Sequence, residues 1–135
     1  MKFILILLLL VTTASAHDDK EHWHNLTPEM KAWYESLKQP TNPTMSCCGL
    51  ADAYWADEVK VLPDGRVEVT ITDDRPDKPL GRPNRPPGTK VIIPKQNMVD
   101  FSKPPNEGKG NPTGHGVLFI SVSGVVYCYV TGTLT

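Results

Sequence analysis

Two long segments rich in proline and glycine set the strongest limit on how this chain can fold. They cover residues 73–89 and 102–116, and we refer to them as the first and second loops. A proline cannot supply the backbone N–H that a central strand or a helix interior requires. Helices and strands must therefore be short and must come from the pieces between these loops. This limit favours a small α+β domain with long Pro/Gly loops.

The piece before residue 40 has the pattern of an amphipathic helix. Thr27 is a favourable N-cap, and Pro28 suits the first helical position. Apolar side chains recur with helical spacing from Met30 to Leu37, and Pro40 stops the pattern. The sequence therefore predicts an N-terminal helix that packs on the rest of the domain.

The remaining pieces read as strands. Apolar residues alternate with polar ones on both sides of a turn at residues 62–65, which predicts a hairpin. Residues 90–93 and two apolar runs around Ser123-Gly124 add further strands, whereas residues 49–58 are ambiguous. We expect a small, mostly antiparallel sheet of about five strands. The alternation also predicts that one set of residues shares a single core: Trp33, Leu37, Val59, Val61, Val67, Val69 and Ile71.

The first residues have the features of an export signal. Lys2 precedes an apolar run at residues 3–11, and Ala14-Ser15-Ala16 fits a cleavage site. The run is shorter than the about 20 residues that a membrane-spanning helix needs. We expect residues 1–16 to be a signal peptide, residues 17–26 a flexible segment with histidines, and residues 27–135 one small disulfide-stapled domain. The mature protein is then periplasmic or secreted, without a membrane span.

The three cysteines predict a disulfide in such an oxidising compartment. A Cys47–Cys48 bond would be strained, because consecutive Cα atoms lie about 3.8 Å apart and disulfides usually need about 4.4–6.8 Å. A bond from either neighbour to Cys128 would close a loop of about 80 residues and stabilise by roughly 4 kcal/mol. We favour Cys48 over Cys47 as the partner. The leftover cysteine could be a reactive thiol or link two chains, and three thiolates could bind Cu(I).

The four histidines offer a second kind of site. His17 would be the mature N-terminus, where an α-amine and an imidazole can chelate copper together. In this it resembles the histidine brace of copper oxygenases and copper carriers. With His22, His24 and His115 it forms a candidate Cu or Zn site, since imidazole suits both metals. The alternative is a solvated polar tail.

The arginines of the first loop are candidate binding residues. Arg75, Arg82 and Arg85 could hold an anionic polymer or a lipid head group, or could simply keep an exposed loop soluble. The formal net charge of the whole chain is −1, which gives no case for a nucleic-acid partner. The common catalytic motifs, such as G-x-S-x-G, the P-loop and H-E-x-x-H, are absent from the sequence.

Four short stretches resemble a group of small exported proteobacterial proteins. They are W-Y-E-S-L (33–37), S-C-C (46–48), N-P-T-G-H-G-V-L-F (111–119) and C-Y-V-T-G-T-L (128–134). Tyr34 stands where that group has phenylalanine, Phe119 where it has tryptophan, and Val130 where it has proline. The resemblance implies an exported bacterial setting and a shared cysteine framework, and it implies no catalytic residue.

These observations favour an exported, non-catalytic domain that binds a periplasmic or extracellular ligand or associates with the cell envelope. No cofactor is expected in that case. The alternatives are a copper- or zinc-binding protein that uses the N-terminal histidines, and a small enzyme without a recognisable motif. The two long loops are the expected binding surface, because loops on a rigid scaffold often carry function.

Overall fold

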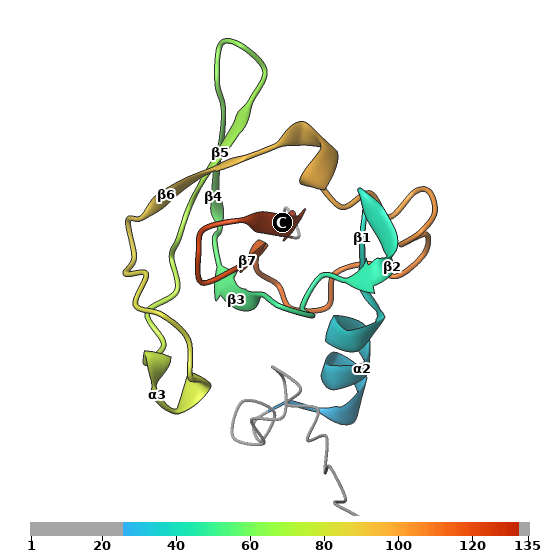
Figure 1. Cartoon of the computed structure of the whole chain (residues 1–135), viewed down its shortest axis with the longest axis horizontal. Helices are drawn as coiled ribbons and strands as arrows, with labels where there is room; N and C mark the ends of the chain where they lie inside the picture. The colour runs from blue at the N-terminus through green and yellow to red at the C-terminus, as the bar shows by residue number, and fades with distance from the viewer. Residues whose placement is uncertain (1–25, 133–135) are drawn as a thin grey trace, which may run out of the picture.

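A computed structural model describes residues 26–132 of the chain and has short helices and eight strands (Figure 1). Helix α2 spans Pro28–Ser36, the single turn α3 spans Asp77–Leu80, and the 3-10 turn η1 spans Lys95–Asn97. The strands are β1 Lys38–Gln39, β2 Asn42–Ser46, β3 Asp52–Trp55, β4 Glu58–Val61, β5 Val67–Thr70, β6 Lys90–Ile93, β7 Val117–Ile120 and β8 Val126–Val130. This confirms a small α+β fold.

The strands form three antiparallel sheets instead of one sheet of about five strands. Their orders are β1-β2, β3-β7-β8 and β4-β5-β6. The strand count was too low because β1, β2 and β3 come from residues 38–55, where the sequence shows connector or ambiguous patterns. Strand β3 forms by pairing with the apolar strand β7, with Tyr54 opposite Leu118. Its identity is therefore set by a partner far away in the chain.

Helix α2 begins where the sequence predicts it. The Thr27 side chain accepts a hydrogen bond from the Met30 N–H, which satisfies one free donor of the first turn. The helix buries Trp33 and Tyr34, and the Tyr34 ring lies 6.0 Å from the Phe119 ring of β7 in an edge-to-face contact. The helix is therefore anchored on the β3-β7-β8 sheet. No helix among residues 26–132 is long and apolar enough to cross a membrane.

The buried residues form two clusters, where the sequence predicts one core. Trp33 and Leu37 belong to the first cluster, which surrounds the disulfide. Val69 and Ile71 are fully buried in the second cluster, between the β4-β5-β6 and β3-β7-β8 sheets. The expected single core is therefore wrong, because the two faces of the β3-β7-β8 sheet are covered by different parts of the chain.

The outer end of the hairpin also differs from the expected core. Val59 and Val61 of β4 are 48% and 68% exposed, respectively. Figure 1 shows the β4–β5 hairpin projecting beyond the rest of the domain. The alternation predicts correctly which face of the hairpin is apolar, since Val59 lies opposite the buried Val69. The covering elements end before that face does, so its outer part is open.

Gly116 lies next to β7, where the backbone closely approaches Ala56 at the end of β3. Its N–H donates to the Asp57 carboxylate, and its carbonyl accepts from the Ala56 N–H at 2.8 Å. A Cβ on Gly116 would lie 2.3 Å from the Ala56 carbonyl oxygen and 2.4 Å from the Tyr129 hydroxyl. Both atoms are held in place, because that hydroxyl donates to the Ala56 carbonyl oxygen at 2.7 Å.

We therefore expect Gly116→Ala to lower the free energy of unfolding by about 1–3 kcal/mol, the usual cost of overpacking. Urea unfolding followed by circular dichroism measures it. Gly49→Ala is the matched control, because a Cβ there meets only ordinary contact distances. Equal midpoints for the two variants would contradict the close approach at Gly116.

Candidate functional site

The disulfide joins Cys47 to Cys128, so the preference for Cys48 is wrong. The Cα atoms lie 5.6 Å apart, within the usual range. Cys48 is free but only 7% exposed, and its Sγ lies 3.2 Å from the Ser46 hydroxyl. Burial raises the pKa of the Cys48 thiol. A buried thiol of this kind is poorly placed for the link between two chains that an unpaired cysteine suggests.

Two of the three first-loop arginines surround one buried carboxylate. Asp73 is fully buried, and its carboxylate accepts hydrogen bonds from Arg75 and Arg82 at 2.6 Å each and from the Trp55 N–H at 3.1 Å. The Arg82 side chain is 1% exposed and also pairs with Asp77 at 2.9 Å. Arg82 is therefore a buried side chain that links two aspartates of the first loop, and it does not face a surface ligand.

Arg85 is also used within the fold. One of its guanidinium nitrogens donates to the carbonyl oxygens of Ser121 and Val122, in the turn between β7 and β8. Its guanidinium carbon lies 5.9 Å from the Tyr54 ring, and that of Arg82 lies 4.5 Å from the same ring. The arginines proposed as a binding loop thus fasten that loop to the β3-β7-β8 sheet.

His115 meets the first loop at Trp55. The two rings are stacked with centroids 3.9 Å apart, and the Arg75 guanidinium carbon lies 3.8 Å from the Trp55 centroid. Two planar groups this close to one centroid must occupy opposite faces of the indole. The two long loops therefore meet here, on either side of Trp55.

The Asp57 carboxylate fixes the orientation of the His115 ring. It lies 3.1 Å from Nδ1 of His115 and accepts hydrogen bonds from the Thr72 hydroxyl and the Gly116 N–H. Burial alone would raise the pKa of Asp57, but these hydrogen bonds outweigh it and lower that pKa. A carboxylate that holds one ring nitrogen is the arrangement of many metal-ligating histidines.

No group of three possible metal ligands occurs within residues 26–132. His115 and Asp57 supply two of the side-chain types such a group needs. The candidate metal site therefore depends on His17, His22 and His24, which lie outside the described residues together with the whole predicted signal peptide.

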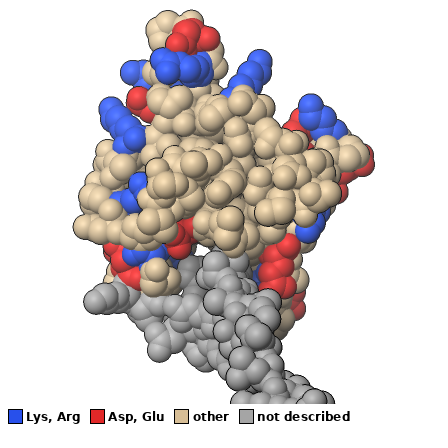
Figure 2. All heavy atoms as spheres, viewed as in Figure 1, with Lys and Arg blue, Asp and Glu red and all other residues tan. Residues whose placement is uncertain are grey.

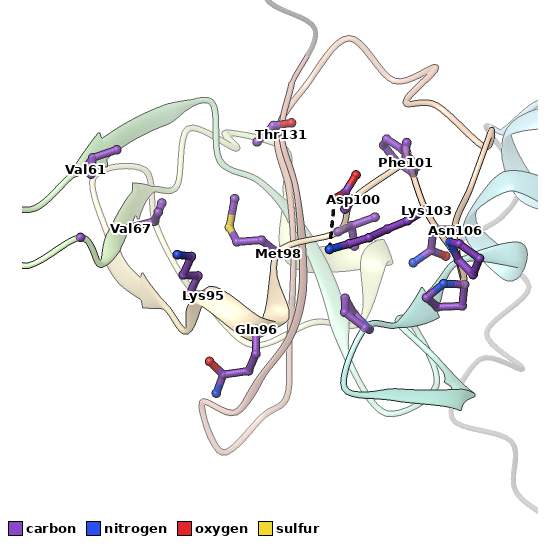
Figure 3. A pocket seen from close by; sticks show the side chains of 15 residues that line it. Val61, Val67, Lys95, Gln96, Met98, Asp100, Phe101, Lys103, Asn106 and Thr131 are labelled. Carbon is purple, nitrogen blue, oxygen red and sulfur yellow. Dashed lines mark ion pairs between the residues drawn. The ribbon is translucent and has the colours of Figure 1, made fainter.

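A groove of about 780 Å³ that is open to a ligand lies beside the projecting hairpin (Figure 3). Val61 and Val67 of the hairpin form one wall, and Met98 lies between the walls. Phe101 and residues 103–106 of the second loop form the other wall. The volume lies within the range of about 300–1,000 Å³ that is typical of ligand sites.

The second wall is held rigidly by two hydrogen-bonded side chains. Asn106 is 1% exposed, and its amide exchanges hydrogen bonds of 2.8 Å with the Lys38 N–H and carbonyl of β1. The Trp33 indole N–H donates to the Gly110 carbonyl at 2.6 Å. The second loop is thus fixed to helix α2 and strand β1 rather than free in solvent.

The rim of the groove carries a few polar groups. Lys95, Gln96 and Thr131 stand along it, and Asp100 forms a 3.6 Å ion pair with Lys103 (Figure 3). A hydrogen bond from Ser102 lowers the pKa of Asp100.

On the face seen in Figure 2, basic and acidic residues are interspersed at the hairpin tip and the periphery. That face has no patch of a single charge sign.

The sequence did not point to most of this groove. Only the part of its wall in the second loop lies on the expected binding surface, and the first loop contributes nothing. The alternation in the sequence places the hairpin valines in the core, and no sequence pattern marks residues 95–101 as part of a site. The apolar face of the hairpin extends beyond the strands that pack on it. The sequence could reveal this only if those packing strands were already known.

The chain matches no protein-family model, no curated protein sequence and no solved structure.

Proposed function

We propose that this protein is an exported, non-catalytic binding domain, and that its groove holds an extended segment of polypeptide with apolar side chains. The observation that supports this most is the open groove itself, whose two facing walls carry apolar residues from separate parts of the chain. These are Val61 and Val67 on one wall, and Phe101, Pro104 and Pro105 on the other. A pre-formed concave site with few polar groups is the usual form of a binding site.

The polar rim favours polypeptide over a purely apolar ligand. An extended chain presents apolar side chains together with backbone N–H and C=O groups that need partners. Gln96 and Thr131 offer both donors and acceptors at the rim, and Met98 can adjust its shape to different side chains. Lys95 has no ion-pair partner among residues 26–132, so an acidic residue or a chain terminus on the ligand would be favoured there.

The titratable groups of the groove support binding rather than catalysis. They are Lys95, Asp100 and Lys103, and two of these three neutralise each other in an ion pair. No nucleophile and base lie within hydrogen-bond reach of each other among the residues that line it. The geometry that activates a nucleophile is thus not formed in this groove.

Export rests on three observations of different kinds. An intramolecular disulfide fits an oxidising compartment, since such bonds are rare in the cytosol. Residues 1–16 have the pattern of a signal peptide. The four short stretches that resemble small exported proteobacterial proteins point to a periplasmic or secreted location.

The groove is tested with a fluorescein-labelled polypeptide that has been reduced and alkylated so that it stays unfolded. Fluorescence anisotropy of this probe reports its binding. Val61→Asp places a charge on one wall, at a side chain exposed enough to leave the fold intact. We expect affinity to fall at least about tenfold, because burying a valine contributes about 1.5–3 kcal/mol and each 1.4 kcal/mol is tenfold.

Val122→Asp is the matched control. Val122 is 73% exposed, close to the 68% of Val61, and does not line the groove. We expect this variant to bind the probe as the unchanged protein does. Equal affinities for the two variants, or no binding by the unchanged protein, would reject polypeptide as the ligand of the groove.

A further inference from the structure

Strand β4 forms an open edge of the β4-β5-β6 sheet. The Leu62 N–H donates to the Arg66 carbonyl at 2.8 Å, and Val61 lies opposite Val67. Backbone groups alternate in direction along an antiparallel strand. Lys60 and Glu58 therefore point their N–H and C=O groups toward β5, as Leu62 does.

The backbone groups of Val59 and Val61 point the other way, out of the sheet. No backbone hydrogen bond to either residue from outside the sheet is formed within residues 26–132. Such a row of free donors and acceptors is a template for pairing with another strand. Strand β4 contains none of the prolines that commonly block an edge.

The side chains of β4 separate by face. Val59 and Val61 lie on the apolar face and are 48% and 68% exposed. Glu58 and Lys60 lie on the opposite face, exposed, and neither forms a salt bridge with any residue that the structure describes. The strand thus carries one acidic and one basic side chain two positions apart. Glu68 of β5 lies opposite Lys60 but forms its ion pair with Lys90.

We propose that β4 pairs antiparallel with β4 of a second copy of this chain, with the two-fold axis at Val59. The two Val59 residues then face each other and exchange their free N–H···O bonds. Glu58 of each copy lies opposite Lys60 of the other, which places opposite charges together twice. The two three-stranded sheets become one continuous sheet, and its apolar face runs on across the axis.

The charges and the apolar face of β4 favour this register over two alternatives. Moving the axis to Lys60 would also align the apolar faces, but it would place Lys60 opposite Lys60 of the second copy, and like charges directly opposite are destabilising. A shift that pairs odd with even residues would turn the valines of one copy to the polar face. The axis at Val59 avoids both penalties.

The contact is short, because β4 has four residues. Stable interfaces usually bury more than about 1,000 Å², so we expect a reversible dimer that dissociates on dilution. Sedimentation velocity over a wide range of protein concentrations measures it. The unchanged protein should shift from monomer to dimer as the concentration rises.

Charge exchange between Glu58 and Lys60 gives the decisive test. Glu58→Lys and Lys60→Glu each place like charges opposite one another, so each should raise the dimer dissociation constant at least tenfold. The double variant restores opposite charges and should dimerise as the unchanged protein does. An equimolar mixture of the two single variants should form a heterodimer, because every facing pair is then complementary.

Glu107→Lys changes the net charge equally at an exposed loop position and should leave dimerisation unchanged. A protein that stays monomeric at all concentrations would overturn the proposal, as would a double variant that is no better than the single ones. The dimer does not depend on the proposed function. Neither Glu58 nor Lys60 lines the groove, so the monomeric Glu58→Lys variant should still bind the unfolded polypeptide probe.

Discussion

Replacing Cys128 by serine should cost about 4 kcal/mol of unfolding free energy, because the disulfide to Cys47 closes a loop of 81 residues in sequence separation. The half-cystines are both fully buried and lie at the centre of the first core cluster, with Leu37, Val117 and Phe119. Breaking the bond therefore increases the conformational entropy of the unfolded chain. It also leaves a thiol and a serine hydroxyl, no longer bonded to each other, in a packed core. Thermal unfolding followed by circular dichroism should show a large fall in Tm.

The control is a comparison of how much stability each cysteine variant loses. The double variant Cys47→Ser/Cys128→Ser should be little worse than Cys128→Ser alone, since the bond can be lost only once. Cys48→Ser should be nearly silent, because a serine hydroxyl there can still reach the Ser46 hydroxyl and the Tyr34 carbonyl oxygen. Peptide mapping without reductant that recovers a Cys48–Cys128 link from the unchanged protein would contradict the structure.

The sequence was informative where a signal is local. Thr27 and Pro28 mark the start of α2 because a cap and a fixed φ act within one helical turn. The alternation from Val59 to Ile71 predicts the hairpin and its apolar face for the same reason. A disulfide to Cys128 follows from strain in the vicinal alternative, which is also a local property.

The sequence was uninformative where the answer depends on partners far apart in the chain. The choice between Cys47 and Cys48 depends on which one faces Cys128 of β8, which lies 81 residues further along the chain than Cys47. Arg82 reads as a solvated loop residue. Its carboxylate partner Asp73 is close in sequence, but the Ala53 carbonyl that also accepts from it lies on β3.

The candidate groove shows the same division. Its residues are ordinary core, turn and loop residues when taken singly, and none carries a recognisable motif. They become a site because the hairpin face extends past Met98 while Asn106 holds the second loop at a distance. The alternation of residues shows which face of a strand is apolar. It does not show how much of that face other elements cover.

Asp73→Asn should be among the most damaging single substitutions in the domain. The Asp73 side chain is fully buried and pairs with Arg82, whose side chain is 1% exposed. Replacing the carboxylate breaks this buried ion pair and leaves Arg82 paired with the partly exposed Asp77 alone among the described residues. Breaking a buried pair by removing one partner costs about 3–5 kcal/mol. The first loop and the backbone of β3 should loosen together, because the carboxylate also accepts from the Trp55 N–H.

Asp74→Asn is the matched control for this change. Asp74 is the next residue, is exposed, and forms no ion pair or hydrogen bond with any residue in the described part of the chain. Its replacement should change the unfolding free energy by less than about 0.5 kcal/mol, as is usual for a surface position. Urea unfolding at neutral pH compares the two variants, and equal losses would show that the buried ion pair does not stabilise the fold.

The same ion pairs predict how stability depends on pH. Burial alone would raise the pKa of Asp73, but hydrogen bonds and charges from Arg75 and Arg82 outweigh it and hold that pKa well below the usual range. A group whose pKa is lower in the folded state stabilises above its unfolded pKa, about 3.9 for aspartate, and loses that contribution as the pH falls further. The stability gap between the unchanged protein and Asp73→Asn should therefore be largest near neutral pH and shrink below about pH 4. Urea unfolding across this pH range measures the gap, and a gap that stays constant down to pH 2 would show that the carboxylate charge is not what holds Arg75 and Arg82 in place.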